Sequence, residues 1–472
     1  MSEVLITANK ADAPVPLRVL SGTEAAAWLE AAAAPVKAAA SLSGFTAKAG
    51  QMLKVGGADG RLEQAVFVLS GEDAAAPGWG AQALRALPAL LPAGDYVLAE
   101  APDALDRTEI ATAFALGSYR FDRYKSSRDG ARARLVAPEG ANLDRARAIA
   151  HACALARDMI NTPANDLGPL QIETIAAEIA EAFGAAMSVI VGEGLLTAGY
   201  PAVHAVGRAA APHRAPRMIE LTWDGSGGDP AAPLVALVGK GVVFDTGGLD
   251  IKPSAGMGLM KKDMGGAAHA LALGRMVMAA GLKLKLVVLI PVAENAISGD
   301  AMRPGDVIAS RKGLSIEVGN TDAEGRLILA DALARAAELG PDLTIDLATL
   351  TGAARAALGP QAPPFFTDDE ALAREVFDAA EACGDGLWRL PLWRGYASAV
   401  DSDIADIKND PDAWAQAGSI TAALFLQRFA PPGAWLHLDI YAWNPKGRPG
   451  WPVGGEAQTI RALFRLLGDR YG

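Results

Sequence analysis

The residues best suited to chemistry lie in a glycine-rich segment, DTGGLDIKPSAGMGLMKKDMGG, at positions 245–266. The apolar run PLVALVG precedes this segment and is separated from it by KGVVF. Such a run is typical of a strand buried on both faces. Asp245 opens the segment and Asp263 lies near its end, and the glycines beside them allow close backbone approach or positive φ. Asp263 alone would be an ordinary helix N-cap. In parallel sheets, however, ligands bind beyond the carboxyl ends of the strands, where Lys240 and Asp245 lie.

A second motif, NTDAEGRL at residues 320–327, opens an expected helix. Asp322 and Glu324 flank the helix start, where free backbone N–H groups and the helix dipole favour negative charge. A lone Asp-x-Glu in that position is usually a cap. Arg326 is disfavoured in a first turn by the same dipole, so it needs another reason, such as an anion to bind.

Taken together, the two motifs predict several carboxylates at one edge of one sheet. The four carboxylates belong to Asp245, Asp263, Asp322 and Glu324. Their mutual repulsion would be destabilising unless cations neutralise it, and two divalent metal ions would do so. No histidine falls inside the motifs, and His269 is expected to pack inside a helix. An oxygen-rich set suits Mg²⁺, Mn²⁺ or Zn²⁺.

The lysines fit the same interpretation. A neutral amine can ligate a metal, and Lys240 is the candidate for that role. Lys252 could stay charged and stabilise developing oxyanion charge. Lys261 and Lys262 are expected to be solvated or ion-paired.

The surrounding pattern predicts an α/β protein. From about residue 170, strands alternate with helices, which indicates a C-terminal catalytic domain with a mostly parallel sheet covered by helices on both faces. The first 140 residues also alternate short strand-like and helical runs, as expected for a smaller α/β N-terminal domain. We therefore expect a domain at 1–140, a linker helix at 141–160 and a catalytic domain at 161–472, because 472 residues exceed one core.

Composition limits the function classes. The net charge of −11 argues against nonspecific nucleic-acid binding, which needs clustered basic residues. The densest basic stretch, RDGARAR at 128–134, is expected to be a solvated loop. The two cysteines, Cys153 and Cys383, have no ligand spacing and predict buried thiols in a reducing cytoplasm. The N-terminus has no signal-peptide pattern, and the alanine-rich runs are too interrupted for a membrane span.

The longer motifs resemble a known family. VGKGVVFDTGGLDIKPSAGMGLMKKDMGGAA (238–268) and NTDAEGRLILADAL (320–333) closely resemble the leucyl aminopeptidase family of dinuclear-metal exopeptidases. NTPANDLGP, ENAISGDAMRPGDV and DLATLTGA resemble further segments of the family in the same order. The resemblance covers roughly residues 155 to 472 and is weaker in the N-terminal third.

The resemblance implies a role for each matching position. It makes Asp245 and Glu324 bridging metal ligands. It makes Lys252 the group that polarises the scissile carbonyl, and Arg326 the holder of a bicarbonate ion that acts as general base. The implied metal ligands are Lys240, Asp245, Asp263, Asp322 and Glu324. The implied substrate-contacting positions are Met260, Asn320, Thr349, Leu350 and Gly352.

The resemblance also implies an activity. It predicts a cytoplasmic, homohexameric, metal-dependent aminopeptidase that uses two Mn²⁺ or Zn²⁺ ions, or Mg²⁺, and releases leucine and other apolar residues from peptides with a free N-terminus. Asp250 departs from the family pattern, where a small polar residue is expected, and we expect it to face solvent. The alternatives are a DNA-binding accessory protein, a dimetal hydrolase of another class such as a phosphatase, and a catalytically inactive scaffold.

Overall fold

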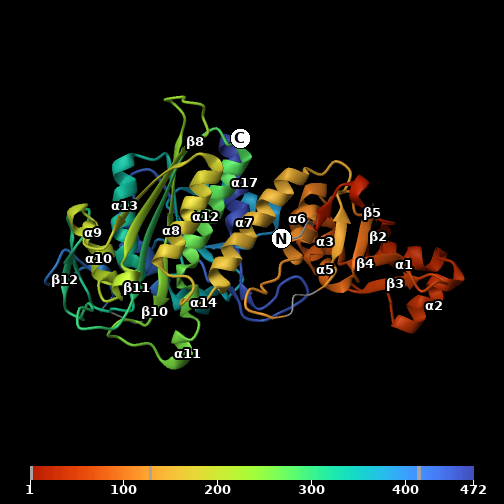
Figure 1. Ribbon diagram of the computed structural model, residues 1–472, viewed down its shortest axis with the longest axis horizontal. Helices are drawn as coiled ribbons and strands as arrows, with labels where there is room; N and C mark the ends of the chain where they lie inside the picture. The colour runs from red at the N-terminus through yellow and green to blue at the C-terminus, as the bar shows by residue number, and fades with distance from the viewer. Residues whose placement is uncertain (1–3, 127–129, 412–415) are drawn as a thin grey trace. The chain divides into compact units, whose positions relative to one another are not determined.

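The computed structural model describes residues 4–126, 130–411 and 416–472. The chain forms two compact units. The N-terminal unit comprises Met1–Ala154, Ala379–Asp385 and Lys446–Val453, and the C-terminal unit comprises Leu155–Asp378, Gly386–Pro445 and Gly454–Gly472. Helix α7 (Leu143–Asn161) carries the chain from the first unit into the second (Figure 1).

A nine-stranded mixed sheet forms the centre of the C-terminal unit. Its strand order is β16-β15-β18-β14-β9-β11-β8-β7, and β10 also pairs with β11. The inner pairs β18–β14, β14–β9, β9–β11 and β10–β11 are parallel, whereas β15–β18, β11–β8 and β8–β7 are antiparallel. The strands are β7 (Ala186–Val191), β8 (Arg217–Asp224), β9 (Leu234–Gly239), β10 (Gly241–Asp245), β11 (Lys285–Asn295), β14 (Leu343–Ala348), β15 (Pro364–Phe366), β16 (Trp388–Arg389) and β18 (Ala434–Asp439).

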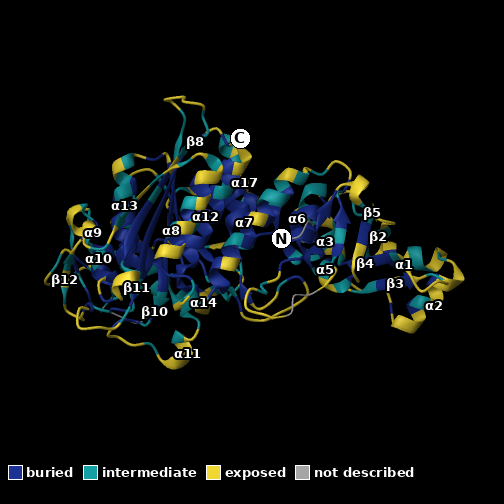
Figure 2. Cartoon of the chain, in the orientation of Figure 1, coloured by how far each residue is buried: buried dark blue, intermediate teal, exposed yellow. Residues whose placement is uncertain are grey.

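Helices cover both faces of this sheet, as the alternating pattern predicts (Figure 1). Successive side chains of a strand point to opposite faces. In β9, Ala236 and Val238 therefore join the core under α13 and α10, whereas Leu237 faces Gly274 of α12. The buried strands are the dark layer between the helices in Figure 2. The covering helices include α8 (Pro169–Phe183), α10 (Pro201–Gly207), α12 (Gly265–Ala280), α13 (Glu324–Leu339), α16 (Gly418–Gln427) and α17 (Ile460–Tyr471).

The N-terminal unit has its own six-stranded sheet, in the order β1-β6-β5-β2-β4-β3. Only the β3–β4 pair is antiparallel. Leu17 and Val19 of β2 face one apolar cluster, and Leu20 faces another, so both faces of the sheet are buried. The elements are β1 (Leu5–Ile6), β2 (Val15–Ser21), α1 (Gly22–Ala31), α2 (Ala34–Ser43), β3 (Met52–Gly56), β4 (Leu62–Leu69), β5 (Gly94–Glu100), α6 (Arg107–Gly117) and β6 (Ala133–Val136).

The α/β fold class is confirmed, and two local features differ from expectation. The basic stretch at 128–134 is not only a loop, because β6 begins at Ala133 and lies inside the N-terminal sheet; residues 128 and 129 lie outside the described residues. The Pro/Gly-rich stretch 446–453 belongs to the N-terminal unit, although it lies late in the chain. Cys153 and Cys383 are both buried. None of the helices in the described ranges is both long and apolar enough to cross a bilayer.

Candidate metal centre

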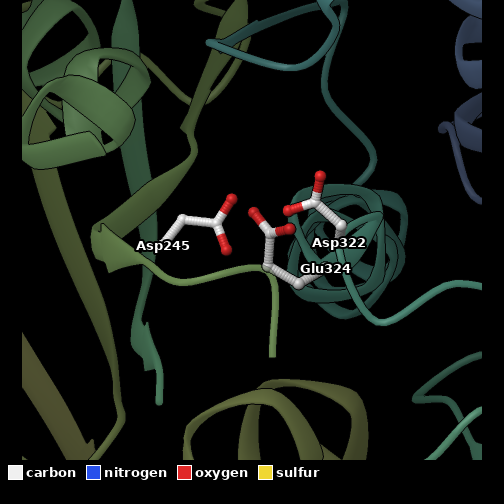
Figure 3. Close-up of side chains that lie close together, drawn as sticks. All are labelled: Asp245, Asp322 and Glu324. Atoms are coloured by element: carbon white, nitrogen blue, oxygen red, sulfur yellow. The ribbon is translucent and has the colours of Figure 1, made fainter. Parts of the chain in front are cut away.

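The predicted carboxylates come together beyond the ends of the parallel strands. Asp245 is the last residue of β10, and Asp322 and Glu324 lie at the start of α13. Each of these three offers one oxygen, and the oxygens all lie within 4.8 Å of one another. Figure 3 shows the three carboxylates pointing toward one another, with α13 seen along its axis. Asp263 lies in the 3-10 helix η4 (Met260–Met264), which leads into α12.

Two glycines let the loop after Asp245 approach this group. Gly247 and Gly248 have φ values of 87° and 63°, a region that L side chains avoid. A Cβ on Gly247 would also lie 3.0 Å from an Asp322 oxygen. Glycine is therefore needed beside Asp245 for two reasons: the backbone conformation disfavours L side chains, and a side chain would not fit.

Lys240 lies directly after β9 and is surrounded by carboxylates. Its Nζ is 2.7 Å from Asp263 Oδ2 and 2.9 Å from Glu324 Oε1, and it donates a hydrogen bond to the Thr349 carbonyl at 3.1 Å. Burial lowers the pKa of this amine, but the neighbouring carboxylates outweigh burial and raise it above the usual value. A divalent cation beside these carboxylates would replace that attraction with repulsion and favour the neutral amine that can act as a ligand.

Lys252 approaches the same carboxylates from the glycine-rich loop. Its Nζ lies 2.7 Å from Asp245 Oδ2 and contacts Asp322. Burial again lowers the pKa, and the charges of Asp245 and Glu324 more than offset it, so the pKa of Lys252 is raised. Lys252 is therefore an ammonium at neutral pH, held over the carboxylate group.

Burial makes it unfavourable for all of these carboxylates to be negatively charged at once. Burial and the nearby Asp245 raise the pKa of Glu324 to about 8 and that of Asp322 to about 6. The buried oxygens Asp263 Oδ2 and Glu324 Oε1 face the Lys240 amine, and the buried Asp322 Oδ1 faces the Lys252 amine. Buried carboxylates are costly unless cations neutralise them, and metal ions are among the few partners that can bind several carboxylates at once. The donor set thus fits divalent cations.

Arg326 extends from the first turn of α13 into the interior. Its side chain is buried, and one Nη donates to the Asn409 carbonyl at 2.6 Å. Its Nε is buried and has no acceptor among the residues that the structure describes. Burial lowers the pKa of this guanidinium, opposed by Asp410, Glu324 and Asp439. A buried N–H with no acceptor matches the anion partner that the sequence predicts for Arg326.

The implied substrate-contacting positions lie on the same loops. Met260 begins η4, three residues before Asp263. Thr349 follows β14, and its hydroxyl donates to Asp263 Oδ1 at 2.9 Å. Asn320 accepts a hydrogen bond from the Asp322 amide at 2.8 Å. Leu350 and Gly352 complete the turn into α14 (Gly352–Leu358), without a hydrogen bond to the metal-site carboxylates among the described contacts.

Several residues that hold the site are absent from the predicted set. Asn295 donates to Asp245 Oδ1 at 2.8 Å, and Asn409 donates to the Asn320 carbonyl at 2.7 Å. Asp439 accepts from the Leu350 and Thr351 amides and so fixes the loop after β14. Isolated Asn and Asp residues on distant elements have no spacing signal, so the sequence alone could not identify them.

Four neighbouring residues can be compared with expectation. Lys262 is buried and lies 3.6 Å from Asp263 Oδ1, so it is ion-paired, and Lys261 donates to the Asn161 carbonyl at 2.6 Å. His269 is buried and uses both ring nitrogens, with Gly265 and Gln458, so it is packed as predicted. Asp250 is exposed, but it also accepts from the Thr321 amide at 2.7 Å and thereby ties the two ligand-bearing loops together.

Comparisons with known proteins assign the chain to a family. A family model described as the cytosol aminopeptidase family, catalytic domain, matches residues 154–464, and one described as the M17 aminopeptidase, N-terminal domain, matches residues 15–138. A probable cytosol aminopeptidase of Syntrophotalea carbinolica is 44% identical over 391 residues, 78% of this chain and 77% of that protein.

Solved structures extend the likeness over the whole chain. A cytosol aminopeptidase from Coxiella burnetii has a TM-score of 0.91 and 41% identity, with 100% of both chains covered. The bottromycin maturation enzyme BotP in complex with Mn has a TM-score of 0.83 and 35% identity, and covers 97% of this chain and 100% of that chain.

The family models and the relatives show that this two-domain α/β protein is a peptidase of the hydrolase class. The chain belongs to the cytosol aminopeptidase family, which includes the leucyl aminopeptidases, and its activity is that of an aminopeptidase. The predicted family resemblance is thereby confirmed, including in the N-terminal third, where the sequence evidence was weaker.

Proposed function

We propose that the protein is a dinuclear-metal aminopeptidase that releases N-terminal amino acids, with leucine and other apolar residues preferred. The observation that carries this proposal is the buried group of carboxylates into which Lys240 and Lys252 both point. In the proposal, the metal ligands are Lys240, Asp245, Asp263, Asp322 and Glu324, with Asp245 and Glu324 bridging. Two Mn²⁺ or Zn²⁺ ions, or Mg²⁺, would supply Lewis acidity and lower the pKa of a water molecule.

Lys252 has the role of stabilising negative charge. Its ammonium is held by Asp245 and Asp322 before substrate arrives, so no reorganisation is needed when the scissile carbonyl oxygen gains charge. The Nζ donates a hydrogen bond to that oxygen. Asp245 and Asp322 keep Lys252 charged, because both lie beside its Nζ.

Arg326 has the role of holding a base. Its buried Nε has no acceptor in the described part of the chain, and the planar guanidinium suits a small planar anion bound in bidentate fashion. Bicarbonate bound there would supply a proton acceptor for water and a donor for the leaving amine. The Asn409 carbonyl fixes the other side of the guanidinium and so orients the open Nε.

Substrate selection follows from the same arrangement. The acidic group of ligands favours a free α-amine over an acylated one, which makes the enzyme an exopeptidase. Met260, Asn320, Thr349, Leu350 and Gly352 are proposed to contact the first residue of the peptide and its backbone. The Thr349 side chain is held by Asp263, so the loop that contacts substrate is tied to the metal ligands.

Oligomeric state and location form part of the proposal. Trp388 and Trp393 of the C-terminal unit are 57% and 59% exposed, so both are accessible to an association surface. The proposed assembly is a homohexamer, which sedimentation equilibrium would test. The two buried cysteines are consistent with a reducing cytoplasm. The acidic charge balance argues against DNA as a partner.

The proposal is tested with the metal-stripped protein. Leucine p-nitroanilide and its N-acetylated form are offered with Mn²⁺ or Zn²⁺ added back. We expect cleavage of the free-amine substrate alone, and only after metal is restored. Equal cleavage of both substrates would refute the exopeptidase mechanism, and full activity without metal would refute the dinuclear site.

A further inference from the structure

The N-terminal unit contains a cavity of about 210 Å³ that the aminopeptidase reaction does not use. It is lined on one side by the end of α6 and the start of β6, and on the other by the Pro/Gly-rich loop 446–453. Three of its lining residues are arginines: Arg120, Arg132 and Arg448. Tyr119 and three prolines form part of the remaining wall.

The wall formed by the loop is well ordered. Arg448 and Trp451 exchange backbone hydrogen bonds of 3.0 and 2.8 Å, and the Arg448 guanidinium carbon lies 4.3 Å from the centroid of the Trp451 ring. Arg85 also stacks on that ring, at 4.5 Å. Gly450 has a φ of 78°, and a Cβ there would lie 2.1 Å from the Arg85 carbonyl oxygen. The loop is therefore closely packed, and Arg448 is held in place by the Trp451 ring.

The cavity is positively charged in an otherwise acidic protein. Its described lining includes no Asp or Glu. Within the part of the chain that the structure describes, neither Arg132 nor Arg448 has a carboxylate within salt-bridge distance. Arg134, two residues further on, contrasts with them because it donates two hydrogen bonds to Asp95, at 2.6 and 2.8 Å. Arg134 is thus neutralised by Asp95, whereas Arg132 lines the cavity.

We propose that this cavity binds a small tetrahedral dianion, phosphate or the phosphate group of a small metabolite. Guanidinium groups match phosphate oxygens with paired, charge-assisted hydrogen bonds. The volume of about 210 Å³ is below the roughly 300–1,000 Å³ of pockets for drug-sized ligands, so the occupant is small. Arg132 and Arg448 hold the anion from two segments that are far apart in the sequence.

Binding is measured by isothermal titration calorimetry of the full-length, metal-loaded protein. Sulfate is the first probe because it is a tetrahedral dianion that chelates metal weakly, and phosphate and succinate are titrated separately. Arg132→Gln and Arg448→Gln are compared with Arg61→Gln, which removes the same charge from an exposed arginine, 86% exposed, outside the cavity. Thermal unfolding of each variant shows that it is folded.

We expect saturable binding of sulfate and phosphate, weakened about tenfold or more by Arg132→Gln and by Arg448→Gln and unchanged by Arg61→Gln. Tight binding of phosphate with no binding of succinate supports a tetrahedral anion. Binding that survives both cavity variants would place the anion elsewhere, at the metal centre above all, and would overturn the proposal. Equal weakening by all three variants would mean nonspecific charge attraction and would also overturn it. If Arg448→Gln fails to fold, Arg132→Gln decides.

Discussion

Replacing Lys252 with methionine separates catalysis from metal binding. Methionine keeps most of the apolar stem but removes the ammonium that lies 2.7 Å from Asp245 Oδ2. Removing one preorganised donor from an oxyanion site costs about 2.7–4 kcal/mol, which is a factor of about 10²–10³ in kcat. KM is expected to change only a few-fold, because the donor acts on charge that appears in the transition state.

The assay is steady-state hydrolysis of leucine p-nitroanilide, together with metal content by elemental analysis. Lys37→Met is the control, because Lys37 is an exposed lysine of α2 and the substitution changes the net charge equally. Normal kcat in Lys252→Met with metal retained would refute the role of Lys252. Loss of both activity and metal would show that Lys252 acts by holding the carboxylates together.

Three further results are expected. Arg326→Lys should lower kcat about 10–100-fold and abolish stimulation by added bicarbonate, and unchanged stimulation would contradict the anion-holding role. Gly325→Ala should displace Lys240, because the new Cβ would lie 2.4 Å from the Lys240 Cε. Metal affinity should therefore fall about tenfold or more. The control Gly299→Ala should leave metal affinity unchanged, because open space surrounds Gly299. Burial and Asp245 raise the pKa of Glu324 to about 8, so a metal ion must displace a proton from Glu324 below that pH. The affinity for Mn²⁺ should therefore rise between roughly pH 6 and 8 and then level off. An affinity that does not depend on pH would contradict this.

The helices that carry the site could be predicted from sequence because local signals agree with one another. The apolar periodicity of α12 and α13 ends in each case at a glycine, Gly281 or Gly340, and both adopt the left-handed conformation. The apolar run of β9 does not alternate with polar residues, as it would if one face were exposed, so it predicts a strand buried on both faces. The strand is buried on both faces in the structure. The position of Asp245 and Glu324 at one sheet edge then follows from the geometry of parallel strands.

Other features depend on pairings between distant segments. Strand direction is not encoded in a short apolar run, so the antiparallel pairing of β8 with β11 could not be predicted. Asn409 and Asp439 act through hydrogen bonds to loops far away in sequence, and nothing local distinguishes them from surface residues. Likewise, the assignment of residues 446–453 to the N-terminal unit depends on close packing against Arg85, which has no sequence pattern.

Metal stoichiometry tests the central claim most directly. The protein is loaded with Mn²⁺, dialysed against metal-free buffer containing a fixed trace of Mn²⁺, and its bound metal is counted by elemental analysis, in parallel with Asp245→Asn and Glu324→Gln. The account predicts two ions per chain in the natural protein and, because both residues bridge, loss of at least one ion in each variant together with loss of aminopeptidase activity. Two ions retained in both variants, or no bound metal in a fully active natural protein, would contradict it.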